Sequence, residues 1–212
     1  MRSKSLDTIN ILIFGYSKVE KMSIIQSFLG IENIEEDLTR DFQPFHGQLN
    51  LKDKKEIKFI LFVQRVIDLS KDELNKIIDL CHGVILILEL TNAESFDYIK
   101  NVVEKLKESP KYEKLYITIF ANNFGPELNY EIQLIKTREF INENKFIYHS
   151  ISTIDENKKG IKELMKYTIE EVYNNKYSKK KNIYFENKKR KEVKIEENEN
   201  EEKEENYWCY FC

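Results

Sequence analysis

Residues 9–28 read INILIFGYSKVEKMSIIQSF, an apolar run that ends at Gly15 and is followed by a helical pattern beginning near Lys21. A strand, a loop and a helix in this order match the phosphate-binding motif G-x-x-x-x-G-K-[ST]. Gly15 and Lys21 are in place, whereas Glu20 replaces the second glycine and Met22 replaces the magnesium-binding hydroxyl residue. The stretch therefore predicts a nucleotide-binding fold with an altered site.

Apolar runs of strand length alternate with longer helical patterns along the rest of the chain. Strands are predicted at residues 8–14, 45–51, 57–63, 83–88, 116–121 and 146–151, and helices at residues 21–29, 71–80, 93–108, 132–142 and 160–174. The last three strands are nearly continuous in apolar residues, which is typical of a parallel sheet buried on both faces. A polar connector after residue 51 predicts one hairpin. The expected fold is α/β, a six-stranded and mostly parallel sheet with one antiparallel hairpin and helices on both faces.

Composition divides the 212 residues into a domain at 1–175 and a charged tail at 176–212. Hydrophobic residues make up 41% of the chain, but no apolar run approaches the roughly 18 residues of a membrane-spanning helix. The N-terminus lacks the apolar core of a secretory signal, so we expect the protein on the cytosolic side. A net charge of −3 argues against general attraction to nucleic acid.

Cysteines and histidines show no metal-ligand or disulfide spacing. Cys81 lies in an apolar segment and is expected to be a packed thiol, and the three histidines, His46, His82 and His149, are expected to be structural. We assign no metal ligand and no catalytic residue.

Three segments together resemble the Ras superfamily of small GTPases, and the Rab branch most closely, over residues 8–175. They are the loop and helix at residues 15–28, the stretch VILILELTNAESF at residues 84–96, and residues 146–165. The second is similar to the fourth strand and the D-x-T-x-x-x-S-F region of Rab proteins, with Glu89 in the Asp position. The resemblance implies the small-GTPase fold, with GTP or GDP and Mg²⁺ as ligands.

The resemblance also assigns a degenerate nucleotide site. It implies that Gly15 and Lys21 hold phosphates, that Thr39 contacts magnesium and the γ-phosphate, that Asn122 contacts the base, and that Ser152 lies in the last base-contacting loop. Ser23 follows the magnesium position by one residue. Four of these residues also have a structural interpretation: a first-turn lysine at Lys21, local packing or capping at Ser23, a surface-loop threonine at Thr39, and a strand-to-loop turn at Asn122.

Several positions depart from the family pattern at once. The D-x-x-G motif and its following Gln are replaced by residues 63–67, in which Gln64 is out of register, and the base-reading Asp is Gly125. Losing that Asp removes roughly 2–4 kcal/mol of base recognition. A Glu20 carboxylate ~4 Å from a phosphate charge would cost about 4 kcal/mol at an effective dielectric of ~20. We therefore predict impaired or absent binding and hydrolysis of GTP.

The tail is basic at residues 179–181 and 188–191, acidic at 196–205, and ends with Cys209 and Cys212. Rab tails are similar in ending with prenylated cysteines, although the spacing here departs from their usual endings. A lipid plus the basic residues could hold the chain at an anionic membrane surface. The alternatives are a solvated charge run and two reduced, unmodified cysteines.

These features predict a Rab-like protein of vesicle and membrane trafficking at the cytosolic face of an internal membrane. It would bind trafficking effectors or regulators through its switch surfaces, as a membrane-anchored pseudo-GTPase. One alternative is a genuine GTPase switch with atypical motifs. The other is a soluble adaptor with no membrane role.

Overall fold

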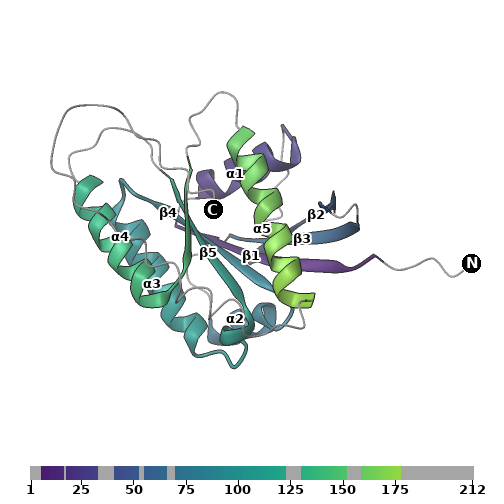
Figure 1. The fold of residues 1–212 in the computed structure, drawn as a ribbon. Helices are drawn as coiled ribbons and strands as arrows, with labels where there is room; N and C mark the ends of the chain where they lie inside the picture. Colours follow the sequence, from purple (N-terminus) through teal and green to yellow (C-terminus); the bar gives the residue numbers. More distant parts are fainter. Residues whose placement is uncertain are drawn as a thin grey trace, which may run out of the picture.

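The central strand of the fold is β1 (Thr8–Gly15), which lies between β3 and β4 in a six-stranded sheet of order β2-β3-β1-β4-β5-β6. The computed structural model describes residues 6–16, 18–32, 41–52, 55–65, 70–122, 130–151 and 159–177. The other elements are α1 (Lys18–Leu29), β2 (Phe42–Asn50), β3 (Glu56–Gln64), α2 (Lys71–Ile78), β4 (Gly83–Glu89), α3 (Ala93–Lys107), η1 (Tyr112–Lys114), β5 (Tyr116–Asn122), α4 (Tyr130–Asn144), β6 (Ile147–Ile151) and α5 (Lys159–Tyr177). Figure 1 shows α1 and α5 on one face of the sheet and α2, α3 and α4 on the other.

The predicted fold class is confirmed. Five strands run parallel, and β2 pairs with β3 in the antiparallel hairpin, with Phe45 opposite Leu61. Strand β2 begins three residues before the predicted start. Its first residue, Phe42, packs edge-on against Phe14 with ring centroids 6.3 Å apart. Pro44 is tolerated in this strand because β2 forms an edge of the sheet.

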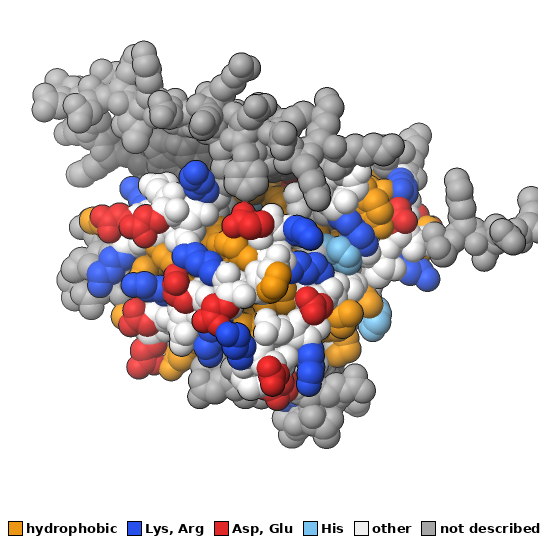
Figure 2. Space-filling view, turned by 90° about the horizontal axis from the view of Figure 1, so that it is seen from below, with side chains coloured by type: hydrophobic (Ala, Val, Ile, Leu, Met, Phe, Trp, Pro, Cys, Tyr) orange, Lys and Arg blue, Asp and Glu red, His pale blue; other side chains and the backbone are white. Residues whose placement is uncertain are grey.

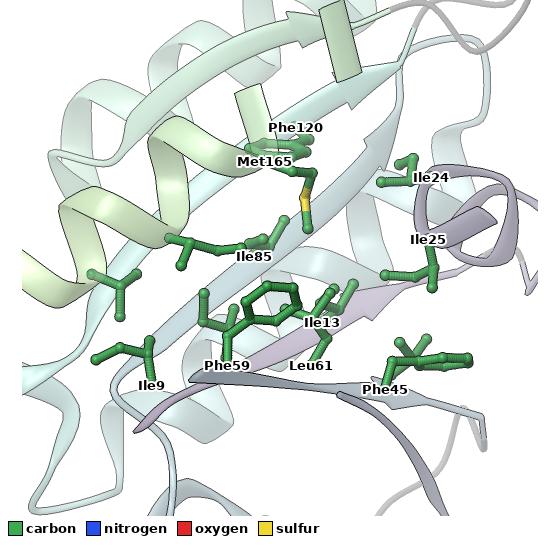
Figure 3. Close-up of a cluster of buried hydrophobic side chains, with 14 of the residues drawn as sticks. Ile9, Ile13, Ile24, Ile25, Phe45, Phe59, Leu61, Ile85, Phe120 and Met165 are labelled. Carbon is green, nitrogen blue, oxygen red and sulfur yellow. The ribbon is translucent and has the colours of Figure 1, made fainter. Parts of the chain in front are cut away.

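Side chains of β1 alternate between two cores, as the period of a strand requires. Ile9, Ile11 and Ile13 pack on the face covered by α1 and α5, whereas Leu12 and Phe14 pack on the face covered by α2, α3 and α4. Figure 3 shows the first of these cores, where Phe120 from β5 and Met165 from α5 lie together. Among the described residues, none of the helices combines the length and apolarity needed to cross a bilayer.

Helix α5 presses closely against the sheet along the apolar stripe that its sequence predicts. Ile161, Met165, Ile169 and Val172 are all buried. A Cβ atom on Gly83 would lie only 2.6 Å from Cγ2 of Val172, so this approach depends on the missing side chain. Cys81 is also buried, which raises the pKa of its thiol to about 12, as expected for a packed cysteine.

A polar clasp joins the end of α5 to the beginning of β1 and to the hairpin. The Lys55 ammonium lies 2.7 Å from Oδ2 of Asp7, donates to the Tyr173 hydroxyl, and lies 4.9 Å from the Tyr173 ring centroid. Lys176 Nζ donates to the Thr8 carbonyl at 2.9 Å. The hydrogen bond to Asp7 raises the pKa of Lys55. The clasp thus joins three segments that lie far apart in the sequence.

Acidification should destabilise the domain through His82. Its Nδ1 accepts a hydrogen bond from the Asn10 N–H at 3.0 Å, and burial, helped by Lys176 and Lys111, lowers its pKa to about 4. Between this value and the ordinary value of 6.5, the unfolded chain holds more protons. The free energy of unfolding should therefore fall by about 2 kcal/mol as the pH drops from 6.5 to 4.

Denaturant unfolding across this pH range measures the effect. The matched variant is His82→Asn, which keeps an acceptor for the Asn10 N–H but does not titrate. Other groups that titrate in acid contribute equally to both proteins, so the difference between the two curves isolates His82. Parallel curves for the two proteins would contradict the assignment.

Candidate functional site

The candidate site lies at the edge of the sheet where its parallel strands end. Gly15 ends β1, Gln64 ends β3, Glu89 ends β4, Asn122 ends β5 and Ile151 ends β6. Glu89, Asn122 and Ile151 lie side by side in register. Ligands of open α/β sheets bind outside this carboxyl edge, so the topology brings Gly15, Lys21 and Asn122 to one edge as the sequence predicts.

The loop between β1 and α1 begins beside a tightly packed glycine, and α1 begins at Lys18, three residues before the predicted start near Lys21. A Cβ atom on Gly15 would lie 3.1 Å from Cβ of Ile87 and 3.2 Å from Cγ of Lys21, so a side chain at this position would require these neighbours to shift by a few tenths of an ångström. Lys21 is only 3% exposed, and its ammonium group donates to the Gly15 carbonyl. A buried ammonium beside the first turn of α1 is suited to anionic oxygen atoms.

The magnesium position next to this lysine is apolar. Met22 is partly buried and packs against the core beneath α1. The carbonyl of Ser23 accepts a hydrogen bond from Oγ of Ser27 at 2.7 Å, within the helix. A thioether is a poor ligand for a hard cation. Within the described part of the chain, no group of three or more His, Cys, Asp or Glu residues could hold a metal ion.

The end of β3 is held by contacts within the domain. Val63, at the first position that replaces the D-x-x-G motif, is buried and packs in the core. Gln64 is 2% exposed and its Oε1 accepts a hydrogen bond from the Tyr98 hydroxyl on α3. The Arg65 N–H donates to the Asp41 carbonyl at 2.8 Å. Val66 and Ile67 lie outside the described residues.

Glu89 supports the start of α3. Its carboxylate accepts hydrogen bonds from Oγ1 of Thr91 at 3.5 Å and Nδ2 of Asn92 at 3.4 Å. The Asn92 side chain in turn caps α3 by accepting from the N–H groups of Glu94 and Ser95. This stretch therefore forms a capped strand-to-helix turn, in which Glu89 has a local structural role.

Asn122 is fully buried at the end of β5, and its carbonyl accepts from the Leu90 N–H at 3.0 Å. Residues 123–125, which follow it, lie outside the described residues. The same holds for Thr39, Ser152, Cys209 and Cys212, so their assigned roles stay predictions.

Comparison with known proteins decides the family. A model of the Ras family matches residues 10–174, which is most of the chain. The chain belongs to the Ras family. It is therefore a small GTPase by family, and the binding of guanine nucleotides with Mg²⁺ is the general property of that family. A search of curated proteins found no match.

Of the two ligands of a Ras-family protein, the described residues fit the phosphates of the nucleotide but do not fit Mg²⁺. Gly15 and Lys21 fit a phosphate chain, because the buried ammonium of Lys21 lies beside the first glycine of the motif. Met22 does not fit Mg²⁺, because its side chain packs on the core and offers only sulfur. We therefore derive no step that uses the metal.

Sequence reasoning missed a group of side chains around the phosphate loop of this Ras-family chain. The Tyr16 hydroxyl donates to Oε2 of Glu94 at 2.5 Å, and the Tyr16 ring lies 6.0 Å from the ring of Tyr98. The hydrogen bond to Glu94 raises the pKa of Tyr16. The sequence shows an aromatic residue directly after Gly15, but it does not show which residue is its partner, because that partner lies 78 residues away.

Proposed function

We propose that this Ras-family protein is a Rab-like binding module of vesicle and membrane trafficking, with impaired or absent binding and hydrolysis of GTP. The observation that carries the proposed loss of GTP binding is the packing of Met22 against the core at the position where the family binds magnesium. Nucleotide binding would then lack its metal and face the added negative charge of Glu20.

Partner binding would use the surfaces that flank the two switch segments. Thr39 of the first switch and residues 66–67 of the second lie outside the described residues, but the described residues beside them are joined by hydrogen bonds. Asp41 and Arg65 share a backbone hydrogen bond, and Gln64 is bonded to Tyr98. These hydrogen bonds support a partner surface that the domain's own contacts help to hold in place.

Membrane attachment would come from the tail, with a lipid on Cys209, Cys212 or both. A single lipid binds only marginally, so a second signal is needed. On the face of the domain shown in Figure 2, Lys and Arg side chains alternate with Asp and Glu rather than forming a patch of one sign. We assign attraction to anionic lipid to the basic tail residues 179–181 and 188–191, where lysine and arginine are most concentrated in the sequence.

Calorimetric titration of nucleotide-stripped protein with GTP and GDP, with and without Mg²⁺, tests the loss of binding. We expect no heat at about 100 μM protein. Lys21→Ala serves as the control, since a residual phosphate interaction would disappear in this variant. Tight, magnesium-dependent binding would contradict the proposal.

Membrane fractionation of the full chain and of the double variant Cys209→Ser, Cys212→Ser tests the anchor. The wild-type chain should sediment with membranes, and the variant should move to the supernatant. An unchanged distribution would contradict lipid anchoring and favour the soluble adaptor.

One observation favours a second candidate, a guanine-nucleotide switch with atypical motifs. Gly15 and the buried Lys21, two residues of the phosphate-binding motif, are retained. The two candidates differ in one readout. A nucleotide-independent module keeps its partners after Lys21→Ala, whereas a working switch loses them.

A further inference from the structure

Two tyrosines connect the phosphate loop to α3 and to the end of β3. Tyr16 lies in the loop, and its hydroxyl donates to the Glu94 carboxylate in the first turn of α3. Tyr98, one turn further along α3, donates its hydroxyl to the buried side chain of Gln64. The two rings lie 6.0 Å apart and are tilted by 55°. A continuous chain of contacts thus runs from Glu94 through both rings to β3.

The contacts between these side chains restrain the elements that they join. A hydroxyl bonded to a carboxylate is a charge-assisted hydrogen bond, which is stronger than a neutral one. A buried amide such as that of Gln64 is costly to leave without hydrogen bonds, so its bond to Tyr98 restrains the end of β3. Tilted aromatic pairs at this separation add attraction beyond their buried area.

The three elements that these contacts join lie around one place in the fold. The phosphate loop, the end of β3 and the start of α3 all lie at the carboxyl edge of the sheet, and in a phosphate-binding fold they surround the site. Phosphate and metal contacts would normally order such loops when a nucleotide binds. Here side chains of the protein already join them.

We propose that Tyr16 and Tyr98 form a latch that holds the phosphate loop, the end of β3 and the start of α3 in one arrangement without nucleotide. The latch goes beyond the proposed function, because it holds whether or not GTP binds. Removing the Tyr98 hydroxyl should therefore weaken the restraint on the phosphate loop, although this hydroxyl donates to Gln64 of β3 and not to the loop.

Hydrogen–deuterium exchange on the nucleotide-free full chain tests this coupling. In Tyr98→Phe, the peptide that covers residues 15–22 should exchange roughly fivefold faster, the size expected for losing one hydrogen bond. Tyr16→Phe should speed exchange in the peptide that covers residues 60–66 by a similar factor. The matched control is Tyr112→Phe, since Tyr112 lies in η1, beyond the other end of α3.

A second measurement reports on the contact itself. Tyrosine ring NMR should show the Tyr16 pKa falling toward its ordinary value of 10.0 in Glu94→Gln, because the carboxylate that raises it is neutralised. A Tyr16 pKa unchanged by Glu94→Gln would overturn the contact. Unchanged exchange of residues 15–22 in Tyr98→Phe would overturn the coupling. Neither readout uses nucleotide, so both are independent of the calorimetric result.

Discussion

Replacing Glu20 with glycine and Met22 with serine is expected to raise the affinity for GTP in the presence of Mg²⁺ on the order of a thousandfold. A carboxylate ~4 Å from a phosphate charge costs about 4 kcal/mol at an effective dielectric of ~20, so removing it corresponds to roughly three orders of magnitude in Kd. The serine restores an oxygen ligand where Met22 offers only sulfur. Calorimetry on the nucleotide-stripped variant measures the gain.

Two controls separate this gain from general effects. Adding Lys21→Ala to the double variant should remove most of it, because the ammonium would no longer reach the phosphates. Glu113→Gln removes a carboxylate in η1 and should leave GTP binding unchanged. Met22→Ser also removes core contacts and should cost about 1–2 kcal/mol of stability, which a melting curve checks. No gain in the stable double variant would mean that Glu20 and Met22 do not limit binding.

Phe120→Ala is expected to lower the free energy of unfolding by about 3–5 kcal/mol. Phe120 is fully buried on β5, within the core formed with α1 and α5 (Figure 3). Truncation leaves a cavity between the sheet and α5, and such a loss is a large share of the roughly 5–15 kcal/mol that stabilises a typical domain. Denaturant unfolding monitored by circular dichroism measures it.

Tyr167→Ala is the matched control for Phe120. Both rings pack edge-on against His149 with centroids 5.9 Å away, but Tyr167 is 38% exposed. Losing its ring should cost about 1 kcal/mol, the size of an aromatic pair at a partly exposed position. Equal losses in the free energy of unfolding would show that burial does not determine the effect of removing a ring that packs against His149.

Sequence periodicity predicted the architecture because each element carries its own pattern. The apolar strands were located to within three residues at each end, and the buried stripe of α5 follows a helical repeat from Ile161 to Val172. Boundaries were less certain where a tertiary contact decides them. Strand β2 begins at Phe42 because its ring meets Phe14, a residue from a different part of the chain.

The places of the motif residues in the fold could be predicted from the sequence, whereas contacts between distant side chains could not. Gly15, Lys21 and Asn122 reach the carboxyl edge of the sheet as expected. The contacts of Tyr16 with Glu94 and of Tyr98 with Gln64 join positions 78 and 34 residues apart. No local pattern encodes such pairs, because they depend on how helix α3 packs against the sheet.

The clasp around Lys55 also determines which part of the domain a pulling force on the tail would act on first. Lys176 and Tyr173 hold the last turns of α5 against Thr8 and Asp7, at the beginning of β1. A pull at residue 178 therefore reaches the middle strand of the sheet directly, without first unwinding α5. A chain tethered at its tail would transmit tension to the strand that ends at the phosphate loop.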